Sequence, residues 1–295
     1  MGVRTTVAEI AYEKDADLAE CPVWDERNNL LCWVDITGGL LYRFDPAGKS
    51  SEHFDIGRDL GSFALRESGG AILATRSGFA FYDFNDRSLT PIENPEPESS
   101  NSRFNDGKCD PEGRFWSGTL TYDFKRGAGS LYCLDTDLKV KRKLQNVTIP
   151  NGMAWDTGKQ LFYFIDSPNR KIYSFRYDRE TGSLSDRSVI RAIDESMGFP
   201  DGMTIDREGA LWVALYEGSR VIRINPESGD TLFSVLLPVP RVTSCTFGGA
   251  DLNELYITTA RENMPKERLE KYPLSGSLFR ARVPFRGSPA VRFAG

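Results

Sequence analysis

Six polar side chains recur along the chain at a nearly constant spacing, and their chemistry is that of a site for a hard cation. They stand 42 to 50 residues apart and are Glu20, Ser62, Asn105, Asn151, Asp201 and Thr246. Two are carboxylates and two are amides, and such oxygen ligands suit calcium, magnesium and manganese. An oxygen-rich site can also bind zinc or ferrous iron, so the pattern leaves the metal open. Glu20 and Asp201, if buried together, would repel each other unless a cation or a proton lies between them.

Histidine and cysteine chemistry is nearly excluded by composition. His53 is the only histidine, and it lies in a polar stretch. A Ser-His-Asp triad and a histidine-rich zinc site are therefore unavailable. The five cysteines are widely spaced and form no CxxC pair, which indicates reduced thiols in a cytosolic protein. They are Cys21, Cys32, Cys109, Cys133 and Cys245.

The third of the six positions has further charged neighbours. Arg103 stands two residues before Asn105, so in an extended segment both side chains lie on one face. An arginine there could position a carbonyl or an anionic ligand. Asp123 follows the expected strand 114–120 and could reach the rim of a site, although the sequence alone favours a solvated turn. Lys108 is expected to be an ordinary solvated charge.

A repeat carries the six positions. Each stands five residues before a turn, and each turn is followed by two apolar residues at the same offset. The turns begin at Asp25, Glu67, Asp110, Asp156, Asp206 and Asp251. Most repeats then continue with a further β-rich run. Helical periodicity is weak, except for a possible short helix over 264–273.

A period near 45 residues with about four short strands is typical of a propeller blade. The sequence therefore predicts an all-β, six-bladed β-propeller that forms a single domain over residues 1–295. We expect N-terminal residues 5–13 to close the ring by pairing with C-terminal residues 290–294. A β-sandwich is the structural alternative, but it does not explain the six-fold period. In a propeller, equivalent residues of successive blades would converge on the mouth of the central channel.

The local alternative is that the polar residues only form turns. Asn151-Gly152 and Asp201-Gly202 are strong hairpin dipeptides. This interpretation does not explain Glu20, which is followed by cysteine and proline at the same phase. Convergence on one site explains all three.

The charge balance limits the partners. The net charge is −5 and no basic block occurs, so we expect no nucleic acid and no anionic membrane as partner. The N-terminus lacks the apolar run of a signal peptide, and no stretch is long enough to span a bilayer. We expect a cytoplasmic protein that binds a small molecule and has no obligate protein partner.

Five stretches also resemble the SMP-30/gluconolactonase/luciferin-regenerating-like family. They begin at Ala19, Arg103, Ile149, Phe199 and Ser244, and they cover residues 19–261 almost continuously. The resemblance implies a six-bladed propeller with one divalent metal, held by Glu20, Asn151 and Asp201. It implies that Arg103 and Asn105 contact substrate, and that Asp123 can bind sugar hydroxyls. Cys21 departs from the glycine or serine that is common after the first glutamate, and the loop at Tyr122 also departs.

The expected function is metal-dependent hydrolysis of an aldonolactone to the free sugar acid. The metal, which could be Ca, Zn, Mn, Mg or Fe(II), would polarise the carbonyl, and Asp201 would act as general base. One alternative is a propeller hydrolase for aryl esters or phosphotriesters. The other is a calcium-binding regulatory protein without enzymatic activity.

Overall fold

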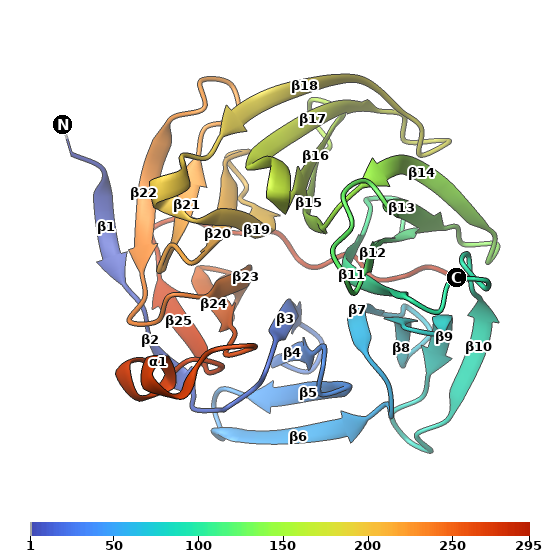
Figure 1. The fold of residues 1–295 in the computed structure, drawn as a ribbon, viewed down its shortest axis with the longest axis horizontal. Coiled ribbons are helices and arrows are strands. Elements are labelled where there is room, and N and C mark those ends of the chain that lie inside the picture. The colour runs from blue at the N-terminus through green and yellow to red at the C-terminus, as the bar shows by residue number, and fades with distance from the viewer. Residues whose placement is uncertain (1) are drawn as a thin grey trace.

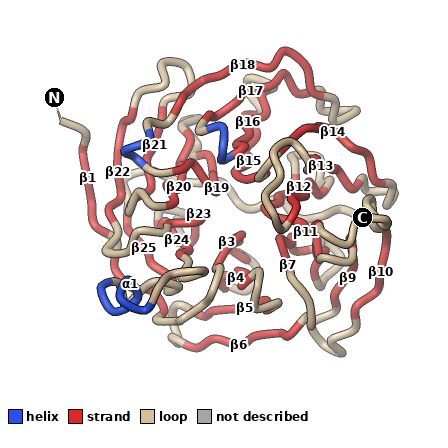
Figure 2. Tube along the Cα trace, viewed as in Figure 1, coloured by secondary structure: helices blue, strands red, loops and turns tan. Residues whose placement is uncertain are grey.

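A computed structural model describes residues 2–295 and shows six β-sheets arranged around a central channel (Figure 1). Strands form nearly all of the regular structure, as Figure 2 shows. The helical elements are the 3₁₀ turns Ser167–Asn169 and Glu195–Met197 and the short helix α1, Lys266–Lys271. The predicted all-β six-bladed propeller is confirmed, and α1 falls within the segment 264–273 for which a helix was expected.

Each blade is an antiparallel sheet whose first strand lines the channel. Blade 1 contains β3 (Ala19–Asp25), β4 (Leu30–Asp35), β5 (Leu40–Asp45) and β6 (Ser50–Asp55); blade 2 contains β7 (Leu60–Leu65), β8 (Ala71–Thr75), β9 (Gly78–Tyr82) and β10 (Leu89–Glu93). Blade 3 contains β11 (Ser102–Cys109), β12 (Phe115–Thr121), β13 (Gly129–Leu134) and β14 (Val140–Val147); blade 4 contains β15 (Pro150–Asp156), β16 (Leu161–Asp166), β17 (Lys171–Tyr177) and β18 (Leu184–Ala192). Blade 5 contains β19 (Phe199–Ile205), β20 (Leu211–Tyr216), β21 (Arg220–Ile224) and β22 (Thr231–Leu236); blade 6 contains β23 (Val242–Gly248), β24 (Glu254–Thr259) and β25 (Leu278–Arg282).

The N-terminus closes the ring, but not with the partner predicted from the sequence. Strand β2 (Glu9–Tyr12) completes blade 6 by pairing with β25, and β1 (Arg4–Val7) adds a parallel edge to β22 of blade 5. The pairing predicted with residues 290–294 is wrong. That segment crosses beneath the propeller to blade 2, where Phe293 forms a bridge with Arg66. Its phenyl ring is fully buried in the apolar cluster between blades 2 and 3, and this burial explains the different destination.

The core is divided among the junctions between blades. Six apolar clusters each join two neighbouring blades around the ring. The cluster between blades 3 and 4, for example, packs Trp116 against Trp155 and Phe162. Since every inner strand is held by apolar contacts on both sides, the channel lining is a rigid frame for polar groups.

The repeated turn aspartates also have a structural role. In blade 3 the Asp110 carboxylate accepts a hydrogen bond from Trp116 Nε1 at 2.9 Å and pairs with Arg114 at 2.6 Å. Asp206 makes the equivalent 2.9 Å bond with Trp212 Nε1 in blade 5. These turn residues therefore tie the first hairpin of a blade to its core. No helix among residues 2–295 has the length and apolar character that a membrane crossing requires.

Candidate metal and substrate site

An irregularity in each inner strand turns polar groups into the channel. The pairing of the first and second strands shifts register between Glu20 and Val23, between Phe104 and Gly107, between Asn151 and Met153, and at the matching point of the other three blades. A β-bulge releases a residue from the ladder and redirects its side chain. The bulge recurs in all six blades, and in blades 1, 3, 4 and 5 it coincides with the recurring polar residue or lies next to it.

The glycines that follow Asn151 and Asp201 are needed for close packing rather than for hairpin turns. Both dipeptides lie inside strands, β15 and β19. A Cβ on Gly152 would lie 2.7 Å from the carbonyl oxygen of Asp201, and one on Gly202 would lie 2.1 Å from Ser244 Oγ. The inner strands of neighbouring blades therefore touch at their bulges, and the local turn interpretation of these dipeptides is wrong.

Hydrogen bonds join the side chains of blades 3, 4 and 5 into one chain. Arg103 donates from a guanidinium nitrogen to Asn105 Oδ1 at 2.8 Å, and Asn105 Nδ2 donates to Asn151 Oδ1 at 2.8 Å. Asn151 Nδ2 donates to Ser167 Oγ at 2.8 Å, and that hydroxyl donates to the Pro200 carbonyl at 2.6 Å. This chain fixes both amide groups, so that the Asn151 carbonyl oxygen keeps one lone pair free.

Glu20 and Asp201 form the acidic side of the same site. Both are buried, at 4 % and 7 % exposure. Burial, together with the charge of Asp106, raises the pKa of Glu20 to about 8. Burial also raises the pKa of Asp201 well above its usual value, with Glu20 as the largest charge contribution. Each of these buried carboxylates would be more stable beside a cation.

The residues present fit a divalent cation. Asp201 Oδ1 is buried and has no hydrogen-bond partner, which is costly for a carboxylate oxygen unless an ion or water contacts it. Glu20 Oε2 accepts the Cys21 amide hydrogen at 2.8 Å, which leaves the other oxygen available. In the described part of the chain no group of three His, Cys, Asp or Glu side chains is arranged to hold a metal. A cation here would thus use the amide oxygen of Asn151 as its third protein ligand.

Two of the six recurring positions do not join this site. Ser62 Oγ lies 2.9 Å from Ser117 Oγ of the next blade, so its hydroxyl links blades 2 and 3. Thr246 lines a cavity farther along the channel. In blades 2 and 6 the bulge comes one and three residues earlier than the repeat predicts, at Gly61 and Thr243. The expected distance of five residues between the inward-facing position and the following turn therefore holds in four blades but not in blades 2 and 6.

Arg103 is only 6 % exposed, and it feels the charges of nearby carboxylates. Burial lowers the pKa of Arg103, and the carboxylates of Glu262 and Asp59 oppose that shift. Burial also raises the pKa of Glu262. Glu262 and Asp59 were not identified from the sequence because both lie in loops outside the repeat. Asp106 was also missed, since neighbouring strand residues normally face opposite sides, and only the bulge turns both Asn105 and Asp106 inward.

Asp123 lies at the rim rather than inside the channel. Its carboxylate is exposed, and a hydrogen bond from Thr121 lowers its pKa. The neighbouring Tyr122 donates its hydroxyl to Asp59 Oδ2 at 2.5 Å. The Arg76 guanidinium lies 5.3 Å from the centroid of the Tyr122 ring. This loop therefore holds Tyr122, and not Asp123, against the groups around Arg103.

All five cysteines are free and buried, in agreement with the sequence. Cys21 adopts a positive φ of 49° at the bulge of blade 1. Its Sγ lies 3.5 Å from the Gly107 carbonyl oxygen of blade 3. Burial raises the pKa of the Cys21 thiol far above its usual range, so it is a protonated, packed side chain rather than a thiolate ligand.

Known proteins share both sequence and fold with this chain. The family model for the SMP-30/gluconolactonase/LRE-like region matches residues 18–261. "Regucalcin" of Xenopus laevis is 39 % identical over 97 % of this chain and 98 % of its own length. "Putative sugar lactone lactonase YvrE" of Bacillus subtilis (strain 168) is 40 % identical over 98 % of this chain and 99 % of its own. The solved structure of a luciferin-regenerating enzyme superposes with a TM-score of 0.92 at 31 % identity, covering 98 % of this chain and 99 % of that one.

The family match includes every strand that carries Glu20, Arg103, Asn105, Asn151 or Asp201, and the relatives align from one end of the propeller to the other. The resemblance noted in the sequence is therefore confirmed, and the chain belongs to the SMP-30/gluconolactonase/LRE-like family.

Proposed function

We propose that the protein is a metal-dependent lactonase that opens a sugar-acid lactone to the free aldonic acid. The proposal rests on the burial of the Glu20 and Asp201 carboxylates, on the charge of Glu20 that acts on Asp201, and on the hydrogen-bonded amide of Asn151. A 40 % identical relative bears the name of a sugar lactone lactonase, which supports the same substrate class. Glu20, Asn151 and Asp201 would hold the cation, and water would complete its shell.

A divalent cation in this position would polarise the lactone carbonyl and stabilise the negative charge that develops on its oxygen. The chain's own groups would orient the substrate. One guanidinium nitrogen of Arg103 donates to Asn105 Oδ1 and to the Phe104 carbonyl, so its other N–H groups remain free to bind the lactone. Because Asn105 is held by both Arg103 and Asn151, movement of the substrate at Arg103 would be transmitted to the metal ligands.

Asp201 would be the general base. Its carboxylate would take a proton from the water whose oxygen attacks the lactone carbonyl carbon, while Oδ1, which has no hydrogen-bond partner, would contact the cation. The carbonyl would re-form as the ring C–O bond breaks, and the proton would pass to the departing ring oxygen to give the free hydroxyl acid. Burial raises the pKa of Asp201 in the metal-free protein, and a bound cation would oppose this shift.

Asp123 would contact substrate hydroxyls from the rim. The carboxylate accepts a hydrogen bond from the Lys125 amide at 3.4 Å, which is a weak contact that a sugar hydroxyl could replace. Such a contact would affect which lactone binds more than it would affect bond cleavage.

The test is hydrolysis of five- and six-carbon sugar lactones, followed with a pH indicator. The chelator-treated protein should be inactive, and Ca, Zn, Mn, Mg and Fe(II) restored one at a time should identify the active ion. The Asp201→Ala variant should lose about 100-fold or more in kcat while keeping its far-ultraviolet circular dichroism spectrum. Aryl-ester or phosphotriester hydrolysis without lactone hydrolysis would contradict the proposal. So would calcium binding with no hydrolytic activity, or a near-native rate in Asp201→Ala.

A further inference from the structure

The central channel contains a second cavity beyond the metal ligands. Each inner strand begins beside the site described above and ends farther along the channel, where a cavity of about 290 Å³ opens. We name this cavity the lower chamber. Residues near the ends of those strands line its walls, including Val23, Lys108, Trp155, Thr204, Ser244 and Thr246, and the segment Ser288–Val291 forms its floor.

The lower chamber and the metal site have different residues. Glu20, Arg103, Asn151 and Asp201 do not contribute to its lining. Its volume is near the lower limit of about 300 Å³ for small-molecule sites. It can therefore enclose a compact organic molecule while the metal ligands are engaged.

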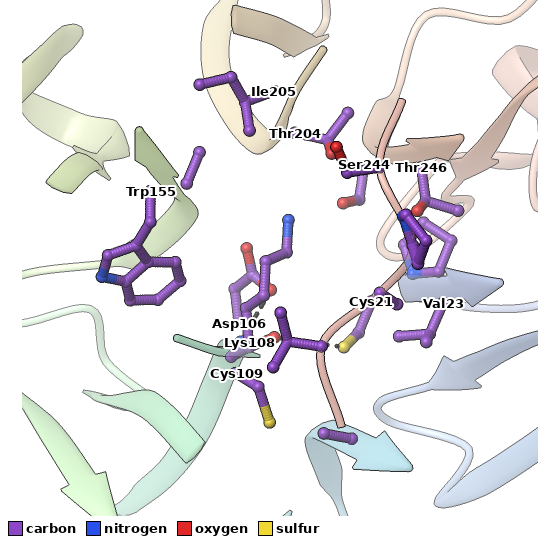
Figure 3. A pocket seen from close by; sticks show the side chains of 18 of the residues that line it. Cys21, Val23, Asp106, Lys108, Cys109, Trp155, Thr204, Ile205, Ser244 and Thr246 are labelled. Atoms are coloured by element: carbon purple, nitrogen blue, oxygen red, sulfur yellow. Dashed lines mark hydrogen bonds between the residues drawn. The ribbon is translucent and has the colours of Figure 1, made fainter. Parts of the chain in front are cut away.

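Lys108 supplies a positive charge inside the chamber. The sequence suggested a solvated lysine, but the side chain reaches into the middle of the cavity, between Trp155 on one side and Ser244 and Thr204 on the other (Figure 3). Its Nζ donates to the Met203 carbonyl at 2.6 Å. An ammonium group has three hydrogens to donate, so two remain for a bound acceptor.

The walls are polar on one side and apolar on the other. Thr204, Ser244 and Thr246 bring three hydroxyl groups from the neighbouring inner strands of blades 5 and 6. Trp155 stands across the cavity from them, as Figure 3 shows. Val23, Phe63 and Ile205 contribute further apolar side chains to the lining. A ligand with a charged end and an apolar body would match this division.

The floor can open more easily than the walls. The Gly287 amide donates to Leu252 at 2.8 Å, and the Phe293 amide donates to Leu65 at 2.8 Å, so both ends of the floor are fixed. Between them, residues 288–291 are exposed and form no backbone hydrogen bond within the described part of the chain. A small molecule could enter by displacing these four residues without breaking a β-ladder.

We propose that the lower chamber binds a compact organic monoanion, namely a carboxylate on an apolar or aromatic body. The carboxylate accepts hydrogen bonds from Lys108 Nζ and from the hydroxyl groups of Ser244 and Thr204. The apolar body packs against Trp155. This site is separate from the proposed lactonase site, and the proposal does not depend on that activity.

Asp106 is the group that opposes an anion there, because it also lines the chamber. Its Oδ1 atom accepts the Gly107 amide hydrogen at 2.7 Å. This backbone bond engages one carboxylate oxygen of Asp106, whereas Lys108 Nζ and the hydroxyl groups of blades 5 and 6 keep hydrogens that a bound carboxylate can accept.

Isothermal titration calorimetry of the full-length protein with benzoate tests the proposal, with benzamide and benzylamine as neutral and cationic analogues. We expect one saturable benzoate site per chain, with affinity for benzamide and benzylamine weaker by about tenfold or more, the loss expected when a charge-assisted hydrogen bond is missing. Lys108→Met should weaken benzoate binding to a similar extent. Lys143→Met, on the outer part of blade 3, is the matched lysine control and should leave binding unchanged.

Arg103→Gln distinguishes the lower chamber from the mouth of the channel, where another cation could attract benzoate. Binding should persist in this variant. A Ser244→Ala variant, which changes a single hydroxyl group, should weaken binding even if Lys108→Met fails to fold. The proposal would be overturned by the absence of saturable binding, by equal affinity for benzamide, or by binding that survives Lys108→Met or Ser244→Ala but is lost in Arg103→Gln.

Discussion

Replacing Glu20 with glutamine tests the electrostatic basis of the site without using enzyme activity. Glutamine has nearly the same shape and retains an oxygen that can accept the Cys21 amide hydrogen, which now bonds Glu20 Oε2 at 2.8 Å. The substitution removes one of two buried carboxylates. In metal-free protein we therefore expect the variant to be more stable than the wild type at alkaline pH, although it binds a cation more weakly.

The size of the effect follows from the pKa. Burial raises the pKa of Glu20 from 4.5 to about 8, so the folded state holds this proton more tightly than the unfolded state does. The wild type therefore has its full stability below about pH 4.5 and loses stability as pH rises towards 8. At about 1.4 kcal/mol per pH unit, the change from about pH 5.5 to about pH 8 costs about 3 kcal/mol through Glu20 alone. The Glu20→Gln variant has no titratable group at position 20, so its free energy of unfolding should not fall with pH for this reason.

Urea unfolding in the presence of a chelator measures the difference. The stability gap between Glu20→Gln and the wild type should grow by about 3 kcal/mol from about pH 5.5 to about pH 8, and saturating metal should reverse its sign at the higher pH. Glu98→Gln makes the same chemical change at an exposed position and should show no such pH dependence. A gap that is independent of pH, or equal to that of Glu98→Gln, would refute the assignment of Glu20 as a buried carboxylate in need of a cation.

Three further substitutions test the packing and the substrate contacts. Gly202→Ala should destabilise the protein by about 1–3 kcal/mol in urea unfolding, because the added Cβ would lie 2.1 Å from Ser244 Oγ. The control Gly158→Ala should be nearly neutral, because the closest atom to its added Cβ is 3.5 Å away. Equal effects of the two substitutions would contradict the close approach of blades 5 and 6. Arg103→Lys keeps the charge but loses the planar group that bonds Asn105, so kcat/KM for lactone hydrolysis should fall about tenfold or more, and an unchanged value would remove Arg103 from the site. Asp123→Ala should raise KM with little change in kcat, since the carboxylate is exposed at the rim; a loss in kcat alone would instead place it in the chemical step.

The repeat allowed the architecture to be predicted because each blade must bury the same faces. Apolar residues after each turn, such as Trp116 and Trp212, recur in phase and are fully buried in the structure. Ring closure was only partly predictable. Both β25 and the segment at Phe293 have strand-like sequences, and the choice between them depends on which apolar cluster accepts Phe293.

The candidate site was predictable where the bulge and the repeat agree. Asn105, Asn151 and Asp201 stand at the bulge and at the predicted phase, and Asn105 and Asn151 are hydrogen-bonded to each other. Thr246 has the right phase, but the bulge of its strand comes earlier, so its side chain lines the lower chamber. A register shift depends on contacts between blades, and those contacts leave no local signal in the sequence.

The central claim is that Glu20, Asn151 and Asp201 share one cation at the mouth of the channel. Anomalous diffraction from a crystal soaked in manganese tests it most directly. We predict a single strong peak at about 2.0–2.6 Å from a carboxylate oxygen of Glu20, from Asn151 Oδ1 and from Asp201 Oδ1. A peak at any other place in the channel, or no peak at a manganese concentration that restores or supports binding in solution, would contradict the account.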